Sequence, residues 1–340
     1  MKESLIDISV LLIFFTRHKQ FKQVFEQVKK ARPSELFLYQ DGPRLDHPDD
    51  MENIKKCREI ANDIDWKCKI HRFYQTKNIG VDPSGYIADT WAFSQTNKCI
   101  VLEDDVVPSV SFFSFCKIML DKYENDERIM LISGFNPEEI TNDISADYFF
   151  SATTFTWGWA SWARVVNQWD IKYSFLKDKN KRKQVQKYIS QKGLVKNMLN
   201  IFEEHLDSGK EHFETLLISN QYLHEGLTIV PKRNMVNNIG VVADSAHYAD
   251  DIEMIPKGYR RIFTMSRFEL DIKSIIHPDR VSDFPPYKDR TYRIYAWGHF
   301  GVKIYRMLEV SFYQLKKGDF KNFTKNLMYK LKKFITRTNA

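Results

Sequence analysis

The alternation of strand-like and helix-like segments over residues 1–135 most constrains the fold of this chain. An apolar run at 8–15 is followed by residues 21–28, in which apolar side chains recur at i, i+3, i+4 and i+7. Further strand-like runs stand at 35–40, 69–74, 99–102 and 129–132, with helix-like segments near 50–64, 83–95 and 109–123 between them. Strands that alternate with helices predict βαβ units, and therefore an α/β fold with a mainly parallel central sheet flanked by helices.

Ligands of such sheets bind beyond the carboxyl ends of the strands, so the loops after the strands are the segments to search for motifs. The chain contains no GxGxxG, no GxxxxGK and no HExxH. A dinucleotide-binding turn, a P-loop and a zinc-protease helix are therefore not predicted. After residue 150 the pattern changes to a tryptophan-rich segment at 156–162, one long helix near 180–205, a second helix near 211–224 and a strand at 227–230.

The positive charge is concentrated at one end of the chain. The net charge is +7, but residues 290–340 hold 12 basic and 2 acidic residues, which is +10 and leaves −3 for residues 1–289. Within that tail, large apolar residues recur every three to four positions between lysines, as in a basic amphipathic helix: Phe320, Phe323, Leu327, Leu331 and Phe334. This pattern predicts contact with an anionic membrane surface; docking of the tail on the body of the protein is the alternative. Nucleic-acid binding is not predicted, because no nucleic-acid motif accompanies the charge.

The cysteines and the apolar runs indicate the compartment. The 4 cysteines make no pair of CxxC motifs at zinc-ribbon spacing, which favours a reduced, cytoplasmic protein without structural zinc. The run at 8–15 lacks the basic start and the small-residue cleavage site of a signal peptide and is expected to be a buried strand. No apolar stretch approaches the ~20 residues of a membrane-spanning helix. We therefore expect a cytoplasmic protein that is at most peripheral on the inner face of the cytoplasmic membrane.

Three adjacent carboxylates, Glu103, Asp104 and Asp105, directly follow the buried strand at 99–102. Because partly desolvated carboxylates repel one another, a cation is expected to compensate them. Oxygen ligands suit Mg²⁺ or Mn²⁺, which keep few protein ligands and take the remainder from substrate phosphates and water. A solvated acidic turn, or the start of a helix, is the alternative interpretation.

Several short motifs in a fixed order resemble bacterial GT-A glycosyltransferases, a group loosely placed with glycosyltransferase family 2, often labelled hemolysin-like, and similar to the N-acetylglucosaminyltransferase I type. They are LLIFFTR (11–17), LYQDGPR (38–44), NIG (78–80), IVLEDDVVPSVSFF (100–113), TWGWASW (156–162) and PKRNMVNNIG followed by SAH (231–247). The resemblance covers roughly residues 8–250. It implies a GT-A catalytic domain over 1–285, with a nucleotide-sugar half at about 1–135 and an acceptor half at about 136–285, followed by the basic helical tail at 286–340.

The resemblance implies roles for residues on the donor side. Asp105 is expected to bind Mn²⁺ or Mg²⁺, which grips the diphosphate of a nucleotide sugar, and His247 is expected to complete the metal site unless it is a structural histidine. Glu103 and Asp104 would face the ribose or the sugar. Four residues are expected to border the nucleotide: Arg17, Asp41, Asn78 and Gly80. For Asp41 the alternative is a plain turn.

The resemblance also implies a general base and a sugar platform. Related enzymes carry a carboxylate about 17 residues before the proline of the late strand, usually after a tryptophan. Here Glu214 stands 17 residues before Pro231 and follows a phenylalanine; Glu211, within one helical turn, is the alternative. Trp157 and Trp159 offer a flat face to a sugar, or else they belong to the core.

The function that the resemblance implies is a metal-dependent inverting glycosyltransferase. It would move a sugar from a nucleotide diphosphate sugar, expected to be a UDP-sugar, to a saccharide acceptor of bacterial surface polysaccharide. A lipid-linked acceptor is a hypothesis that rests on the basic tail alone. Two alternatives stay open: a sugar nucleotidyltransferase, and a non-catalytic protein that binds nucleotide sugars or glycans. The nucleotidyltransferase is disfavoured because its glycine-rich N-terminal phosphate loop is missing.

Overall fold

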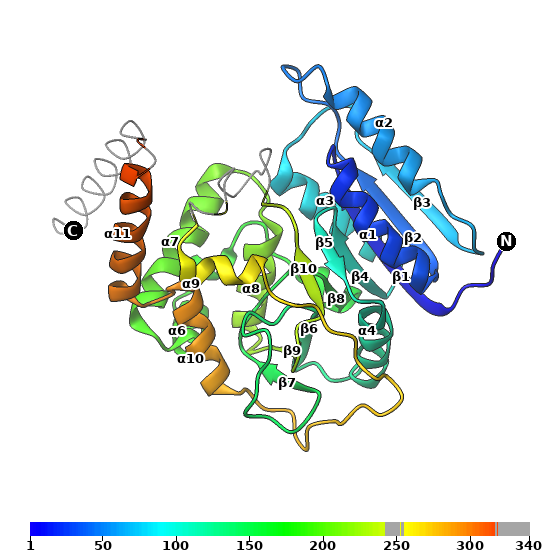
Figure 1. Ribbon diagram of the computed structural model, residues 1–340. Coiled ribbons are helices and arrows are strands. Elements are labelled where there is room, and N and C mark those ends of the chain that lie inside the picture. Colours follow the sequence, from blue (N-terminus) through cyan, green and yellow to red (C-terminus); the bar gives the residue numbers. More distant parts are fainter. Residues whose placement is uncertain (242–251, 253–254, 317, 319–340) are drawn as a thin grey trace.

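The computed structural model describes residues 1–241, 252, 255–316 and 318, and it has the predicted α/β architecture (Figure 1). An eight-stranded central sheet has the order β3-β2-β1-β4-β8-β6-β9-β7, and a two-stranded ribbon joins β10 to β5. The strands are β1 (Ile6–Phe14), β2 (Pro33–Gln40), β3 (Lys69–Tyr74), β4 (Lys98–Glu103), β5 (Val106–Pro108), β6 (Ile129–Ser133), β7 (Tyr148–Ser151), β8 (Trp159–Trp162), β9 (Leu227–Pro231) and β10 (Val236–Asn238).

The sheet is mainly parallel, as the sequence predicts. The strands β3, β2, β1 and β4 run side by side in one direction, β6 and β9 run the same way, and only β7 and β8 are antiparallel to their neighbours among the described residues. The antiparallel β8 is the tryptophan-rich segment, and its insertion between β4 and β6 was not predicted. Its four residues, WASW, include a serine and follow a glycine, so they do not make the continuous apolar run by which the other short strands were recognised.

Helices cover both faces of the sheet. α1 packs against α2 and α4, and α3 packs against α5 and α8. The helices are α1 (His18–Ala31), α2 (Asp50–Ala61), α3 (Val81–Phe93), α4 (Val110–Lys122), α5 (Ala163–Val166), α6 (Lys179–Ile189), α7 (Lys192–Ser208), α8 (Phe213–Leu223), α9 (Lys257–Arg260), α10 (Pro285–Tyr295) and α11 (Phe300–Lys316), with 3-10 turns η1 (Ser174–Lys177) and η3 (Arg261–Phe263). The apolar residues of α1 that the periodicity selects are all buried against the sheet.

The prediction of one long helix near 180–205 is wrong, because two helices occupy this range. α6 ends at Ile189, because the next residue, Ser190, has a φ of 62° that no α-helix accommodates, and α7 starts at Lys192. Together with α8 and η1 these helices enclose a second, smaller hydrophobic cluster that includes Phe175, Phe202 and Tyr222. Leu216 and Tyr222 of α8 belong to this cluster, whereas Phe213 at the start of α8 belongs to the main core.

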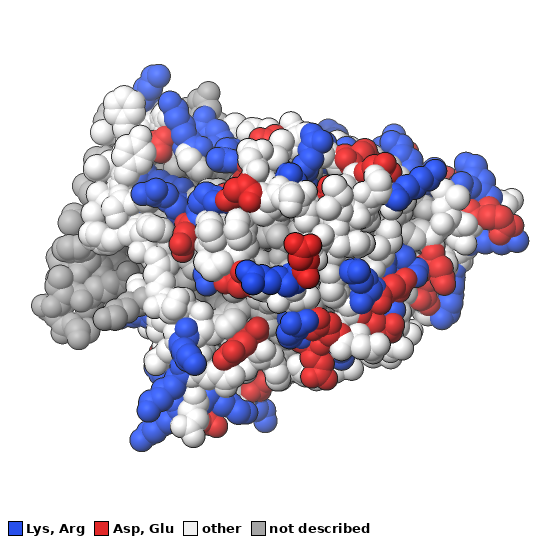
Figure 2. All heavy atoms as spheres, turned by 90° about the horizontal axis from the view of Figure 1, so that it is seen from below, with Lys and Arg blue, Asp and Glu red and all other residues white. Residues whose placement is uncertain are grey.

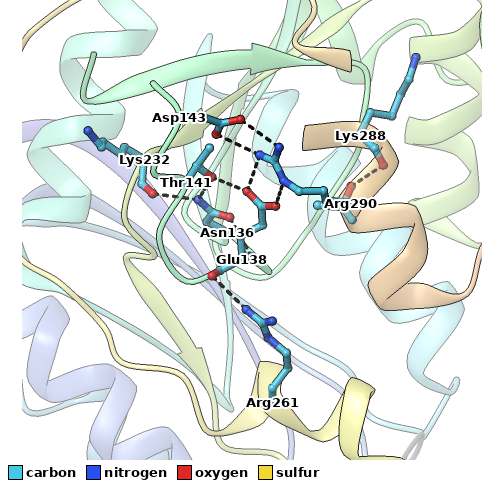
Figure 3. A network of polar contacts seen from close by, with 9 residues as sticks. Asn136, Glu138, Thr141, Asp143, Lys232, Arg261, Lys288 and Arg290 are labelled. Atoms are coloured by element: carbon cyan, nitrogen blue, oxygen red, sulfur yellow. Dashed lines mark hydrogen bonds and ion pairs between the residues drawn. The ribbon is translucent and has the colours of Figure 1, made fainter. Parts of the chain in front are cut away.

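The first part of the basic tail packs on the body. Tyr287 of α10 is fully buried, with its ring 4.7 Å from that of Phe149. Figure 3 shows Arg290 of α10 pointing into the loop after β6, where its guanidinium pairs with the carboxylates of Glu138 and Asp143. The apolar repeat at 320–334 lies outside the described residues. No helix in the described ranges has the length and apolar character needed to cross a bilayer.

Candidate functional site

The carboxyl ends of β1, β2, β3 and β4 lie next to one another in the sheet and bring the predicted donor-side residues to one edge. Arg17 follows β1, Asp41 follows β2, Asn78 and Gly80 follow β3, and the acidic triplet ends β4. In a parallel sheet this edge is where ligands bind. Of the residues predicted for the site, His247 alone lies outside the described part of the chain.

Arg17 supplies the cation that the acidic triplet needs. Its Nη1 donates to Oδ2 of Asp105 at 2.5 Å and lies 3.6 Å from Oδ1 of Asp104, while the backbone N–H of Phe15 donates to Oδ2 of Asp104 at 3.1 Å. Burial lowers the pKa of Arg17, but Asp104 and Asp105 outweigh burial and the pKa is raised. Burial and the neighbouring Asp105 raise the pKa of Asp104 to about 7, although Arg17 opposes them. The triplet is thus a compensated buried cluster, not a solvated turn.

The late segment at 236–240 closes over Asp105. β10 pairs with β5, so the N–H of Ile239 donates to the carbonyl of Asp105 at 2.8 Å. Nδ2 of Asn238 lies 3.4 Å from Oδ1 of Asp105. A Cβ on Gly240 would come within 2.0 Å of Oδ2 of Asp105, so only glycine leaves this carboxylate its position. Residues far apart in the sequence thereby meet at the predicted metal ligand.

Asp41 ties the loop after β3 to the end of β2. Its carboxylate accepts from the N–H of Gly42 at 2.8 Å, of Ile79 at 3.0 Å and of Gly80 at 3.1 Å, and from Nδ2 of Asn78 at 2.8 Å. Burial raises the pKa of Asp41, although these N–H donors work in the opposite direction. The structure brings Asp41, Asn78 and Gly80 together as predicted. We call this arrangement the loop clamp, because the Asp41 carboxylate holds the loop at 78–80 against the end of β2.

Glu214 lies in the first turn of α8 and is half-buried. Burial, with a contribution from Asp82, raises the pKa of Glu214 to about 7. Burial raises the pKa of Glu103 well above its usual range, and Asp105 and Glu214 raise it further, which places Glu214 in electrostatic reach of the end of β4. The charge of Glu211 instead acts on Tyr86, whose pKa is raised chiefly by burial. Of the two glutamates, Glu214 is the one that shares an environment with the triplet.

Asp89 of α3 is a buried carboxylic acid that the sequence reasoning missed. It is 0% exposed, and neither of its oxygens has a hydrogen-bond partner among the described residues. It lies one helical turn beyond Gly85, where a Cβ would come within 2.6 Å of the ring of Phe213, so α3 and α8 are in close contact beside Glu214. Burial raises the pKa of Asp89 well above its usual range, and Glu214 adds to this effect. A carboxylate in the otherwise apolar stretch IADTWAF was the available signal.

The two tryptophans lie in different environments. Trp159 is 1% exposed in β8, where its ring stacks between Phe93 and Phe213 at centroid distances of 6.1 and 6.4 Å, which corresponds to the core interpretation. Trp157 is half-buried, with its ring 4.6 Å from that of Phe135 and 5.3 Å from that of Phe263. Trp157 is the one that keeps an accessible face.

The carboxylates at this edge of the sheet are candidate ligands of a divalent metal ion. No cluster of three His, Cys, Asp or Glu side chains suited to a metal occurs in the ranges described above. Asp104 and Asp105 nevertheless present carboxylate oxygens to one cation, the Arg17 guanidinium. Mg²⁺ is typically held by one or two carboxylates and completed by substrate phosphates, so these oxygens fit an ion that arrives with a nucleotide diphosphate.

Comparisons with known proteins add little. No protein-family model matches the chain, and no curated protein matches it in sequence. Among solved structures, mouse xyloside xylosyltransferase 1 has a TM-score of 0.34 at 9% identity, covering 66% of this chain and 85% of its own. The inositol-1-phosphate CTP transferase from T. maritima has a TM-score of 0.35 at 10% identity, covering 80% and 98%. A mycobacterial protein has a TM-score of 0.29 at 11% identity, covering 47% of this chain, which spans 54% of that protein's length. At such TM-scores these likenesses carry no argument about activity.

Proposed function

We propose that the protein is an inverting, metal-dependent glycosyltransferase of the GT-A type that uses a nucleotide diphosphate sugar. The observation that supports the proposal is that Glu214 of α8 lies within electrostatic reach of the acidic triplet at the carboxyl edge of the sheet. The triplet has Arg17 as a counter-charge, and Glu214 is half-buried with its pKa raised to about 7. A diphosphate leaving group and a hydroxyl nucleophile need these two kinds of group.

The triplet and Arg17 form the donor side. Asp105, supported by Asp104, would hold Mn²⁺ or Mg²⁺, and such an ion stabilises the charge that develops on a departing diphosphate by several kcal/mol. Arg17 donates to the phosphate or to a base carbonyl, a role that its planar, permanently charged guanidinium suits. The Asp41 clamp orders the loop at 78–80 beside the nucleotide. Trp157 is the candidate sugar platform, and His247 is a further candidate metal ligand.

Glu214 is the proposed general base. It takes the proton of the acceptor hydroxyl, the acceptor oxygen forms a bond to the anomeric carbon, and the bond from that carbon to the diphosphate oxygen breaks on the opposite face. The configuration is therefore inverted. A base works best when its pKa is close to the working pH, and the pKa of Glu214 is raised to about 7. The proposed donor is a UDP-sugar, and the proposed acceptor is a saccharide of bacterial surface polysaccharide, attached to a lipid.

The test pairs Glu214→Gln with Glu211→Gln. Release of free nucleoside diphosphate from a panel of nucleotide sugars, with Mn²⁺ and an acceptor, measures transfer. Glu214→Gln should lose about 10²- to 10⁴-fold in kcat while nucleotide binding is kept, because the amide cannot accept the proton. Glu211→Gln should keep most of the activity. Equal losses in the two variants would remove Glu214 as the base, and pyrophosphate release from a nucleoside triphosphate and a sugar phosphate would identify a nucleotidyltransferase instead.

The pH profile gives a second, independent measurement. A base must be ionised, so kcat/KM should rise with pH and level off above an apparent pKa of about 7. A profile that stays flat from pH 5.5 to 8.5 would contradict the assignment.

A further inference from the structure

Helix α11 carries an unusual share of the exposed apolar surface. The described residues include 14 large apolar side chains that are exposed, and 6 of these lie on this 17-residue helix. Their exposed fractions run from 38% to 67%: Phe300, Ile304, Tyr305, Leu308, Phe312 and Leu315. Exposed apolar side chains that form one continuous patch mark an interaction surface, whereas scattered ones do not.

The spacing puts these side chains on one face of the helix. Four of them, Phe300, Ile304, Leu308 and Phe312, recur at intervals of four residues, so they form a row along the helix. The opposite face packs on the body: the N–H of Lys257 donates to Oε1 of Glu309 at 3.1 Å, and Nη2 of Arg306 donates to the carbonyl of Ile294 at 2.5 Å. The apolar row therefore faces outward.

Basic residues predominate in the elements near this row. α9, α10, α11 and the 3-10 turn η3 together hold nine basic residues and two acidic ones, Asp289 and Glu309. Arg290 and Arg306 face the body, and five of the other basic residues are exposed: Lys257, Arg261, Arg293, Lys303 and Lys316. In Figure 2, Lys and Arg predominate at the end of the molecule where α10 and α11 lie in Figure 1, while both signs alternate over the rest of the visible face. Lys303 and Lys316 of α11 are themselves exposed.

α11 contacts α10 through Arg306, and α10 is in turn fixed on the body. Tyr287 is fully buried, and Arg290 pairs with Glu138 and Asp143 (Figure 3). The apolar row is thus presented on a fixed support. A surface of this kind does not need to fold when it binds, so the cost in conformational entropy is small.

We propose that the outward face of α11 docks on an anionic phospholipid bilayer, with its apolar row at the boundary of headgroups and acyl chains and its basic residues at the lipid phosphates. An apolar face flanked by Lys and Arg is the pattern of helices that lie in the membrane interface. A second copy of the chain is a poorer partner, because its equally basic surroundings would repel this surface. A nucleic acid would leave the apolar row without a partner. The proposal goes beyond the sugar transfer and does not depend on it.

The test is co-sedimentation of the full chain with vesicles of phosphatidylcholine, alone and mixed with phosphatidylglycerol. The wild type should bind the mixed vesicles, and binding should fall when salt is raised from about 0.1 M to about 0.5 M. Leu308→Glu with Phe312→Glu should lose roughly tenfold or more in partition, because two apolar anchors become charged. Lys316→Glu should lose less and should lower the salt dependence.

The matched control is Ile272→Glu with Ile276→Glu, which changes two exposed isoleucines elsewhere and should bind as the wild type does. Both double variants alter exposed positions, so equal melting temperatures verify that they fold. Unchanged vesicle binding by the α11 variant would overturn the proposal. Two further results would overturn it if the wild type does not bind vesicles. One is a dimer of the wild type that the α11 substitutions dissociate, and the other is salt-sensitive binding to nucleic acid. Because no donor or acceptor is present, failure here is distinct from failure of the proposed transfer.

Discussion

The two acidic regions of the site handle their charge in opposite ways. At the ends of β1 and β4, Asp104 and Asp105 have Arg17 as a counter-charge. Between α3 and α8, Asp89 has no hydrogen-bond partner within the described structure, and Glu214 lies beside it with a raised pKa. In the first region a cation opposes the rise in pKa that burial causes, although the pKa of Asp104 still reaches about 7. In the second region the neighbouring acid adds to that rise, because Glu214 raises the pKa of Asp89 further.

Removal of Arg17 tests the compensated region and should have the largest effect on stability. Arg17→Ala leaves buried carboxylates without a counter-charge, which should lower the free energy of unfolding by about 3 kcal/mol at pH 8. At pH 5 the loss should be smaller. The pKa of Asp104 is raised to about 7, so this carboxyl is already protonated there and has no pairing to lose. Urea denaturation at both pH values measures the difference.

Arg128→Ala is the matched control, since Arg128 pairs with Asp126 on the surface, where its side chain is 62% exposed. Exposed pairs contribute little, so this variant should unfold as the wild type does. The compensation argument fails if Arg17→Ala loses as much stability at pH 5 as at pH 8.

The loop clamp of Asp41 belongs to the same region, and its removal should lower stability by an intermediate amount. Asp41→Asn replaces one acceptor oxygen by an NH₂ group that faces backbone N–H donors, so buried donors lose their partner at about 2 kcal/mol. Thermal unfolding measures the loss. Asp46→Asn, an exposed position in the same loop, is the control and should change little. If Asp41→Asn loses no more stability than the control, the loop at 78–80 does not depend on the clamp.

The sequence predicts the sheet better than it predicts the region beyond it. β1, β2 and β4 each contain an apolar run of four or more residues next to a helix-like segment, so both their type and their order were recognisable. β3 is a weaker signal, with Ile70, Phe73 and Tyr74 as its apolar residues. The break at Ser190 was not recognisable, because its positive φ occurs at a serine and is not marked by a glycine at that position. The four-residue β8 was missed because WASW is not a continuous apolar run.

For the site, residues that end strands were predictable, and residues that depend on packing were not. Arg17, Asp41 and the triplet follow apolar runs, so their place at one edge follows from the parallel sheet. Arg17 as the partner of Asp105 required the three-dimensional structure, because 88 residues separate the two. Asp89 was missed because its importance comes from the contact between α3 and α8, which no periodicity reveals.

Replacement of Asp89 tests the region between α3 and α8. It should cause the smallest change in the free energy of unfolding, and this change should be an increase where the other variants show a decrease. The folded-state pKa of Asp89 is raised above its unfolded value, so between these values the folded protein binds more protons and its free energy of unfolding falls as pH rises. Asp89→Asn has nearly the same shape and no charge. It should therefore unfold like the wild type near pH 4 and be more stable, by about 1–2 kcal/mol, at pH 8. Glu59→Gln, an exposed carboxylate on α2, should show no such dependence. A loss of stability in Asp89→Asn that grows with pH would mean that Asp89 is ionised and bound to a cation, and the two regions would then differ less than their contacts indicate.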